Sequence, residues 1–193
     1  MIMDKKCVQC TLVGDGMVGK TCLALSFIGE LADSEEDYVA TVFENYAGNV
    51  AVAGEKYTIS IFDSAGQHDY ASLRAFTYKD SEVFVLCYSV IDRESFNSIK
   101  SFWVPELKEF VGRKRPILLV GTQTDCRYLH EDGKTVSKKE GEELAKDIGA
   151  EGYFESASFT SEGVRPVFDK VVLSALKYRK KKSKILQRIF GDR

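Results

Sequence analysis

Hydrophobic and polar positions alternate along the chain in blocks that predict strands and helices in turn. The continuous apolar runs Val83–Tyr88 and Ile117–Val120 are typical of strands buried on both faces of a sheet. Between them, large apolar side chains recur at helical spacing over Ser95–Phe110. The same reasoning predicts further strands at Val8–Val13, Val42–Ala53, Tyr57–Phe62 and near Tyr153–Phe154, and helices at Lys20–Leu31, Ser137–Ile148 and from Val164 onward.

Strands that alternate with helices indicate a fold of the α/β class. We expect a mostly parallel, six-stranded sheet with helices on both of its faces. Ligands of such sheets bind at the carboxyl ends of the strands, so the loops that follow the strands are where functional residues are expected. The length of 193 residues suits one compact domain.

Charge is distributed unevenly, although the formal net charge is only −2. Lys177–Arg193 contains eight Lys or Arg and one Asp, whereas the preceding 176 residues contain 19 basic and 28 acidic side chains. The acidic character of the first 176 residues argues against a nucleic-acid-binding protein. It also indicates that the basic C-terminal segment has a separate role. We therefore predict one domain over residues 1–178 and a basic tail over residues 179–193.

The sequence shows no secretory signal, and no stretch approaches the ~20 apolar residues of a membrane span. We therefore expect a cytoplasmic protein with reduced cysteines. Cys7 and Cys10 form a CxxC pair, but residues three apart in a strand point to opposite faces, and no second pair accompanies them. We interpret both cysteines as structural.

The segment Gly14–Thr21 reads GDGMVGKT and matches the whole phosphate-binding motif GxxxxGK[ST], after a predicted strand and before a predicted helix. Glycines let the backbone wrap so that its amides point at phosphate oxygens, and the helix N-terminus adds its positive end. We expect Lys20 on the β- and γ-phosphates and the Thr21 hydroxyl on Mg²⁺. The predicted contacts with the phosphates are Gly16, Met17, Val18, Gly19, Lys20, Thr21 and Cys22.

A second loop, DSAGQ at Asp63–Gln67, follows the predicted strand Tyr57–Phe62. Its carboxylate, Asp63, can hold Mg²⁺ through a water molecule. Gly66 can donate its N–H to a γ-phosphate, and Gln67 can orient an attacking water. The loop therefore predicts chemistry at the end of a triphosphate.

A third loop, TQTD, follows the buried strand Ile117–Val120. The carboxylate of Asp125 can accept two N–H bonds from N1 and N2 of guanine, a donor pair that adenine does not present. The aliphatic stem of Gln123 can cover the face of the base. This loop indicates guanine as the base.

With these three loops, the chain resembles the small GTPases of the Ras superfamily, and among them the Rho family. The resemblance covers about residues 6–178 and implies the G-domain fold of P-loop NTPases. Four segments are Rho-like: DYVATVFENY at Asp37–Tyr46, QHDY at Gln67–Tyr70, WVPE at Trp103–Glu106, and Thr122–Gln123. Most relatives carry Asn-Lys in place of Thr122–Gln123.

The resemblance implies roles for individual residues. Thr41 resembles the threonine that ligates Mg²⁺ beside Thr21 and senses the γ-phosphate, and Tyr38 resembles the tyrosine that closes over the phosphates. Gly16 resembles the glycine that leaves room for Gln67 and for a partner's arginine. Because Gly16 and Gln67 both match the family's residues, the resemblance implies that the protein hydrolyses GTP. The residues implied in catalysis are Lys20, Thr41, Gly66 and Gln67, and the implied metal ligands are Thr21 and Thr41.

The segment that closes over guanine can be aligned in two ways. Matching the family's Ser-Ala dipeptide places Ser156-Ala157 at the base. Matching without gaps to Gly163 places Ala157-Ser158 there, with the Ser158 N–H on guanine O6. We prefer the second alignment.

Two departures from the family pattern affect the expectations. The loop before Thr41 is longer than usual and acidic, with no aromatic residue between Phe27 and Tyr38 to stack on the guanine, so Leu31 is the nearest candidate and we expect fast nucleotide exchange. Only 31 residues lie between Asp125 and Ala157, too few for most of the Rho insert helix.

The sequence therefore predicts a Mg²⁺-dependent guanine-nucleotide switch with slow GTP hydrolysis, which the family associates with actin signalling. The alternatives are an interaction module that binds GTP and barely hydrolyses it, and another P-loop enzyme such as an ATPase or nucleotide kinase. Exchange factors, GTPase-activating proteins and effectors are expected at Val42, Phe43, Asn45, Tyr70 and Leu73.

The basic tail suits an anionic membrane surface, at about 1 kcal/mol for each nearby charge. The lysines concerned are Lys180, Lys181, Lys182 and Lys184. A solvated extension of the last helix is the alternative. The sequence ends in FGDR rather than in Cys-a-a-X, so lipid anchoring stays open. We expect a cytoplasmic protein that cycles to the cytoplasmic face of a membrane.

Overall fold

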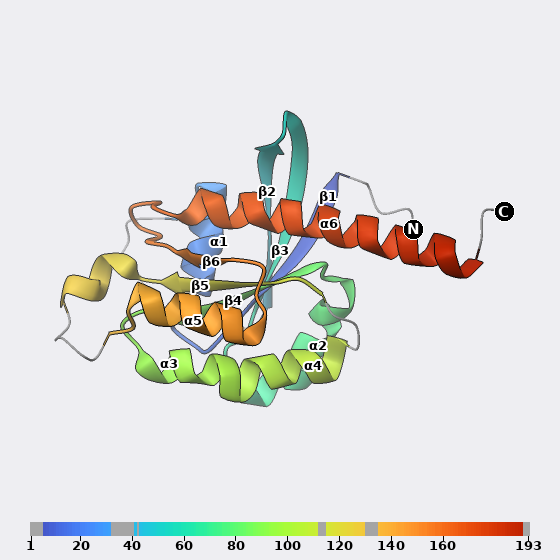
Figure 1. Ribbon diagram of the computed structural model, residues 1–193. Coiled ribbons are helices and arrows are strands. Elements are labelled where there is room, and N and C mark those ends of the chain that lie inside the picture. Colours follow the sequence, from blue (N-terminus) through green and yellow to red (C-terminus); the bar gives the residue numbers. More distant parts are fainter. Residues whose placement is uncertain (1–5, 32–40, 42, 112–114, 130–134, 191–193) are drawn as a thin grey trace.

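A computed structural model describes residues 6–31, 41, 43–111, 115–129 and 135–190, and it places a six-stranded sheet between two layers of helices (Figure 1). The strand order is β2-β3-β1-β4-β5-β6. β2 is antiparallel to β3, and the other neighbouring strands are parallel, as the sequence predicts. The strands are β1 (Cys7–Val13), β2 (Phe43–Val52), β3 (Glu55–Ser64), β4 (Val83–Ser89), β5 (Ile117–Thr122) and β6 (Tyr153–Glu155).

The helices cover the sheet because its strands are apolar on both faces. In β4, alternate side chains join two different cores: Val85 packs towards one helix layer and Leu86 towards the other. The first layer contains α1 (Lys20–Ile28) and α6 (Val164–Phe190). The second contains α2 (Ala71–Asp80), α3 (Arg93–Ser98), α4 (Val104–Val111) and α5 (Lys138–Ile148).

Two predicted helices differ from the observed ones for local reasons. α1 ends at Ile28 rather than Leu31, because Gly29 adopts a left-handed conformation with φ 79° and ends the helix. The helix predicted over Ser95–Phe110 is α3 followed by a wider π-helical turn, η2 (Ile99–Trp103), and by α4. Pro105 has no N–H to bond to the preceding turn, which favours such a break.

The start of α5 confirms the predicted capping box. Ser137 accepts a hydrogen bond from the Glu140 amide at 3.3 Å, and the Glu140 carboxylate accepts one from the Ser137 amide at 2.8 Å. The remaining short helices are the 3₁₀ segments η1 (His68–Tyr70) and η3 (Thr124–Leu129).

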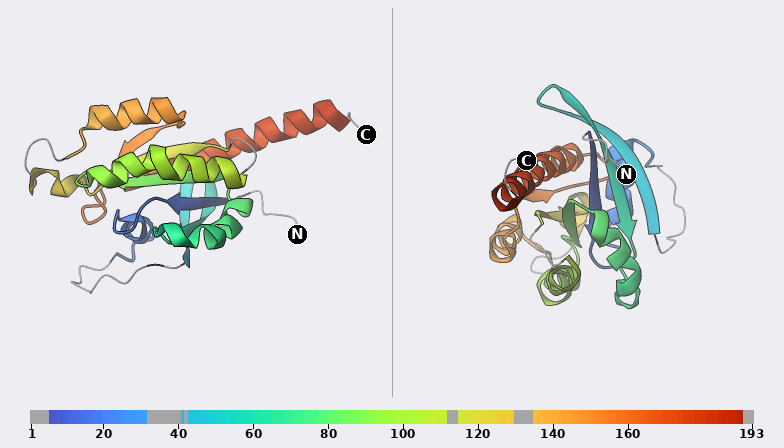
Figure 2. Two further views of the ribbon diagram at one scale, coloured as in Figure 1. Left: turned by 90° about the horizontal axis from the view of Figure 1, so that it is seen from below. Right: turned by 90° about the vertical axis from the view of Figure 1, so that its right-hand side faces the viewer.

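The last helix extends beyond residue 178 into the predicted basic tail. α6 continues without interruption from Val164 to Phe190, and its C-terminal part extends past the sheet (Figures 1 and 2). The basic residues after position 178 therefore continue a helix that is packed on the domain.

Candidate nucleotide and metal site

The glycine loop predicted to bind phosphate connects β1 to α1 and packs against β4. Gly14 has a φ of 151°, and a Cβ at this position would lie 2.1 Å from the carbonyl oxygen of Cys87. Only glycine therefore fits where the loop leaves the sheet. The loop ends at Gly19, directly before the first turn of α1, so the helix N-terminus faces the loop.

Lys20 lies inside this loop rather than in solvent. Its ammonium group donates hydrogen bonds to the carbonyl oxygens of Gly14 at 2.9 Å and Asp15 at 2.6 Å. Burial lowers the pKa of Lys20, and the nearby carboxylate of Asp63 opposes part of that change. The structure thus confines a cationic side chain within the predicted phosphate site.

Three predicted metal-site residues from distant parts of the sequence meet at the start of α1. The Thr21 hydroxyl donates to Oδ2 of Asp63 at 2.5 Å, and it lies 3.0 Å from the Thr41 hydroxyl. Because Thr21 uses its own hydrogen on Asp63, it is the acceptor for Thr41. Burial raises the pKa of Asp63, and the Thr21 hydrogen bond counters part of this rise.

The oxygens at this position fit the donor set that Mg²⁺ prefers. The second carboxylate oxygen of Asp63, Oδ1, is buried and makes no hydrogen bond within the described residues. Two hydroxyls and a carboxylate suit a small divalent cation that keeps water and phosphate ligands. The described ranges contain no group of three His, Cys, Asp or Glu that could hold a metal.

Gly66 and Gln67 follow β3 beside the phosphate loop. A Cβ on Gly66 would lie 2.3 Å from the amide nitrogen of Gly16, so the two backbones approach too closely for any other residue. Gln67 has an exposed side chain. The structure therefore places the predicted glutamine next to the loop, with its amide group at the surface.

A buried ion pair that the sequence did not predict lies next to the Gln67 backbone. Arg74 on α2 is only 1 % exposed and donates to the carboxylate of Glu106 at 2.9 and 2.5 Å. The same guanidinium donates to the carbonyl oxygens of Ala65 at 3.1 Å and Gln67 at 2.5 Å. Charged side chains are seldom fully buried, so the sequence of α2 carries no signal that could have identified this pair.

Trp103 adds a second link that the sequence does not reveal. Its indole nitrogen donates to the carboxylate of Asp15 at 2.8 Å, and the Arg74 guanidinium lies 4.8 Å from the centre of its ring. The π-helical turn η2 ends at Trp103. The phosphate loop and the Gln67 segment therefore contact the same aromatic side chain directly or through Arg74.

Gln123, predicted to cover the base, lies against the phosphate loop. Its φ is 59°, its amide donates to the Met17 carbonyl at 3.3 Å, and its Oε1 accepts from the Ser89 hydroxyl. Thr122 donates to the Val18 carbonyl at 2.5 Å. The polar end of Gln123 is thus bound to protein, which leaves its aliphatic stem for a base face.

The two predicted guanine loops meet at the same end of the sheet. The Thr124 amide donates to the Ser156 carbonyl at 3.3 Å, directly beside Asp125. The amide of Ser156 donates to Gly121 at 2.9 Å, and that of Ala157 donates to Glu162 at 2.9 Å. Both amides therefore have protein acceptors, which favours the alignment that assigns the base contact to Ser158.

The remaining predicted contacts vary in exposure. Met17 is 70 % exposed at the tip of the phosphate loop, Val18 is buried, and Cys22 is half-buried in α1. Tyr38 and Val42 lie outside the described residues.

The predicted partner surface has exposed apolar side chains from three elements. Phe43, Tyr70 and Leu73 are 43 %, 37 % and 37 % exposed, and Asn45 accepts a hydrogen bond from Ser60 at 3.0 Å. Phe76, which the sequence analysis did not single out, is 68 % exposed on α2.

The lysines predicted for membrane contact, Lys180, Lys181, Lys182 and Lys184, are exposed on α6. Arg179 differs, because it is partly buried and pairs with Glu82 at 2.5 Å. Within the described ranges, no helix has the length and apolar character needed to cross a membrane.

Most of this chain matches a protein-family model. The family model described as the Ras family matches residues 9–177. That span contains the phosphate loop, Asp63, Gln67 and both base loops, and it ends within α6.

Proposed function

The chain belongs to the Ras family of small GTPases, and from this premise we propose that it is a Rho-like switch that binds GTP and GDP with Mg²⁺ and hydrolyses GTP slowly. The Rho-like part of the proposal is supported by QHDY at Gln67–Tyr70 and WVPE at Trp103–Glu106. The observation that carries the proposal is the contact of the Thr21 hydroxyl with both Asp63 and Thr41, next to the loop that encloses Lys20.

Phosphate binding uses the loop and its lysine. Loop amides point at phosphate oxygens, and the ammonium group of Lys20 exchanges its bonds to the Gly14 and Asp15 carbonyls for bonds to phosphate. Bonds between two charged groups are stronger than bonds to carbonyls. Thr21 and Thr41 would hold Mg²⁺, with Asp63 beside it, and the ion would neutralise charge on the β- and γ-phosphates.

Hydrolysis is the attack of water on the γ-phosphorus. The bond to the β–γ bridging oxygen breaks, GDP leaves with that oxygen, and the proton of the water passes to the phosphate released. Gln67 orients the water, and the Gly66 N–H and Lys20 stabilise charge on the γ-phosphate oxygens. The reaction is slow because the exposed Gln67 side chain must be ordered before each attack.

The GTP-bound form would present Phe43, Asn45, Tyr70 and Leu73, together with Val42, to effectors, exchange factors and activating proteins. The exposed lysines of α6 would attract an anionic membrane surface, so the protein would be cytoplasmic and cycle to the cytoplasmic face of a membrane. The pathway implied by the Rho resemblance is actin signalling.

The experiment is single-turnover hydrolysis of GTP by the purified protein and by Gln67→Leu. We expect slow hydrolysis with Mg²⁺ that the substitution reduces about a hundredfold, since positioning terms of this kind are worth several factors of ten. Hydrolysis unchanged by Gln67→Leu would favour the alternative of a GTP-bound interaction module.

Competition between nucleotides separates the proposal from other P-loop enzymes. We expect GTP and GDP to displace a fluorescent guanine nucleotide while ATP does not. Asp125→Asn should shift the preference from guanine to xanthine, whose C2 carbonyl accepts from the new amide. Tight ATP binding by the parent protein would contradict the guanine assignment.

A further inference from the structure

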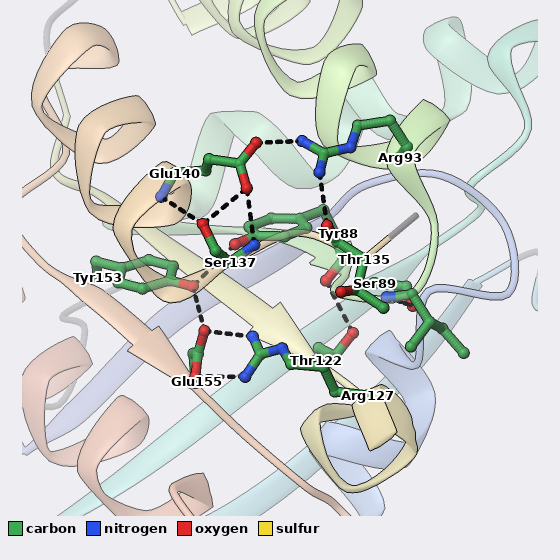
Figure 3. A network of polar contacts seen from close by, with 11 residues as sticks. Tyr88, Ser89, Arg93, Thr122, Arg127, Thr135, Ser137, Glu140, Tyr153 and Glu155 are labelled. Carbon is green, nitrogen blue, oxygen red and sulfur yellow. Dashed lines mark hydrogen bonds and ion pairs between the residues drawn. The ribbon is translucent and has the colours of Figure 1, made fainter. Parts of the chain in front are cut away.

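An ion pair joins the two loops that are predicted to contact the base. The Arg127 guanidinium in η3 donates to both carboxylate oxygens of Glu155, at 2.6 and 3.2 Å (Figure 3). The two side chains are 30 % and 18 % exposed, so the pair is largely withdrawn from solvent. Two-pronged bonds of this kind fix both distance and orientation.

Glu155 is also bound from the side of the sheet. The Tyr153 hydroxyl donates to it at 2.8 Å, and the Tyr88 hydroxyl lies 2.9 Å from that of Tyr153 (Figure 3). Because Tyr153 donates to Glu155, it accepts from Tyr88. Burial raises the pKa of Tyr88 to about 12 and also raises the pKa of Tyr153, so both hydroxyls keep their protons.

The fold leaves space for Tyr153 at two glycines. A Cβ on Gly141 of α5 would lie 2.2 Å from the ring of Tyr153, and a Cβ on Gly121 of β5 would lie 3.0 Å from the Tyr88 hydroxyl oxygen and 3.1 Å from that of Tyr153. The hydrogen-bonded side chains Tyr88, Tyr153 and Glu155 are therefore closely packed between β4 and β6.

The ion pair lies within three residues of the predicted contacts with the guanine edge, Asp125 and Ser158. Arg127 follows Asp125 by two positions, and Glu155 precedes Ala157 by two and Ser158 by three. Asp125 must accept from the base while Ser158 donates to it, so recognition requires a definite distance between the loops. A preformed distance lowers the ordering cost of binding.

We propose that Arg127 and Glu155, oriented by Tyr153 and Tyr88, are positioning residues that set the guanine specificity of the site. Neither residue is a base contact itself. The inference rests on the proposed function, since it assumes a guanine between Asp125 and Ser158. It adds that the fit of the base depends on an ion pair between the two loops.

The test compares release of fluorescent GDP and inosine diphosphate from the parent, Arg127→Ala and Glu155→Gln. Inosine lacks the 2-amino group that donates to Asp125, so its binding depends less on the loop distance. We expect GDP release to accelerate about tenfold in Arg127→Ala, with little change for inosine diphosphate, because a bond between charged groups is worth about that factor. The preference for guanine therefore falls.

Arg93→Ala supplies a matched control. Arg93 pairs with Glu140 at 2.5 Å, is comparably exposed, and lies in the same network, but it joins α3 to α5 rather than the base loops (Figure 3). This variant should lose stability without changing the ratio of GDP to inosine diphosphate release. Equal changes for both nucleotides in Arg127→Ala would show a merely structural role and overturn the proposal.

Two further variants keep the test decisive if Arg127→Ala folds poorly. Tyr153→Phe preserves the ring against Gly141 and removes only the hydroxyl, so we expect a change of about threefold in the same direction. The double variant Arg127→Ala/Glu155→Gln should be no more affected than its worse single variant. Additive effects would overturn the pairing, whereas a parent protein that binds no GDP would overturn the proposed function as well.

Discussion

The guanidinium of Arg74 donates to the backbone carbonyl of Gln67 at 2.5 Å while it forms a buried ion pair with Glu106. The residue implied in water positioning is therefore attached to α2 through its backbone, although its side chain is exposed. Helix α2 and the Gln67 segment are expected to move as one unit.

Arg74→Lys should slow GTP hydrolysis several-fold without weakening GDP binding. A lysine keeps the charge opposite Glu106 but lacks the fork that reaches the Gln67 carbonyl at the same time. Single-turnover hydrolysis and GDP titration measure the two quantities. Hydrolysis at the parent rate would contradict a link between Arg74 and Gln67.

Arg74→Met should destabilise the protein by about 3–5 kcal/mol, because it leaves the 7 % exposed Glu106 as an uncompensated buried charge. Combining it with Glu106→Gln should recover part of this loss. Urea unfolding of the single and double variants measures the difference. A loss below about 1 kcal/mol in the single variant would show that Glu106 is readily hydrated or protonated.

Glu140 should make stability depend on pH. The Arg93 hydrogen bond, with those of Ser137, lowers the pKa of Glu140 from 4.5 to about 2. A lowered folded-state pKa means that the charged form stabilises the fold above pH 4.5, and that this contribution disappears as the pH falls towards 2. Glu140→Gln should therefore be less stable than the parent at pH 7 by up to about 1 kcal/mol, since the pair is more than one third exposed.

Urea unfolding at pH 7 and pH 3.5 checks this prediction. The difference between the parent and Glu140→Gln should shrink at the lower pH. Glu142→Gln, an exposed position on the same helix, serves as the control and should show no such trend. A difference that grows on acidification would contradict the assigned sign.

Leu31→Phe should slow GDP release about fivefold. Phe27 cannot stack on the base, because its ring is already packed within the protein. The centres of the Phe27 and Phe168 rings lie 3.9 Å apart, and a Cβ on Gly48 would lie 2.3 Å from the Phe27 ring. A phenylalanine at position 31 would restore an aromatic contact worth about 1 kcal/mol. Release of fluorescent GDP from the parent, Leu31→Phe and Leu31→Ile measures this effect, and slow release from the parent would contradict the expectation of fast exchange.

Replacing Lys180, Lys181 and Lys182 by Gln should weaken binding to vesicles that contain phosphatidylserine at least tenfold. Each charge near an anionic surface contributes about 1 kcal/mol, and the contribution decreases with salt. Co-sedimentation at two salt concentrations measures binding. The control replaces Lys138, Lys139 and Lys146 on α5, which removes the same charge; equal weakening by both sets would contradict a role for α6.

Much of the site could be predicted from the sequence because its motifs are local. The glycine loop reads directly as GxxxxGKT, and the capping box places the start of α5 correctly. The buried pair of Arg74 and Glu106 could not be predicted, because its partners are 32 residues apart and their burial depends on how α2 packs against α4. The same holds for Arg127 and Glu155, which are 28 residues apart.

By itself, the sequence determined the α/β fold class, the phosphate loop with Lys20 and Thr21, and the residues expected around a guanine nucleotide, since hydrophobic period and motif spacing act over short distances. The tertiary structure brings Thr41 to Thr21, which the resemblance implied. It alone decided that the Ser156 and Ala157 amides are already bonded, and that Arg74 donates to the Gln67 backbone carbonyl. The Thr41 and Ser156 contacts join residues at least 20 positions apart, which come together only once the sheet aligns the ends of its strands. The Ala157 and Arg74 contacts are closer in the chain, but they depend on how a loop or a helix packs.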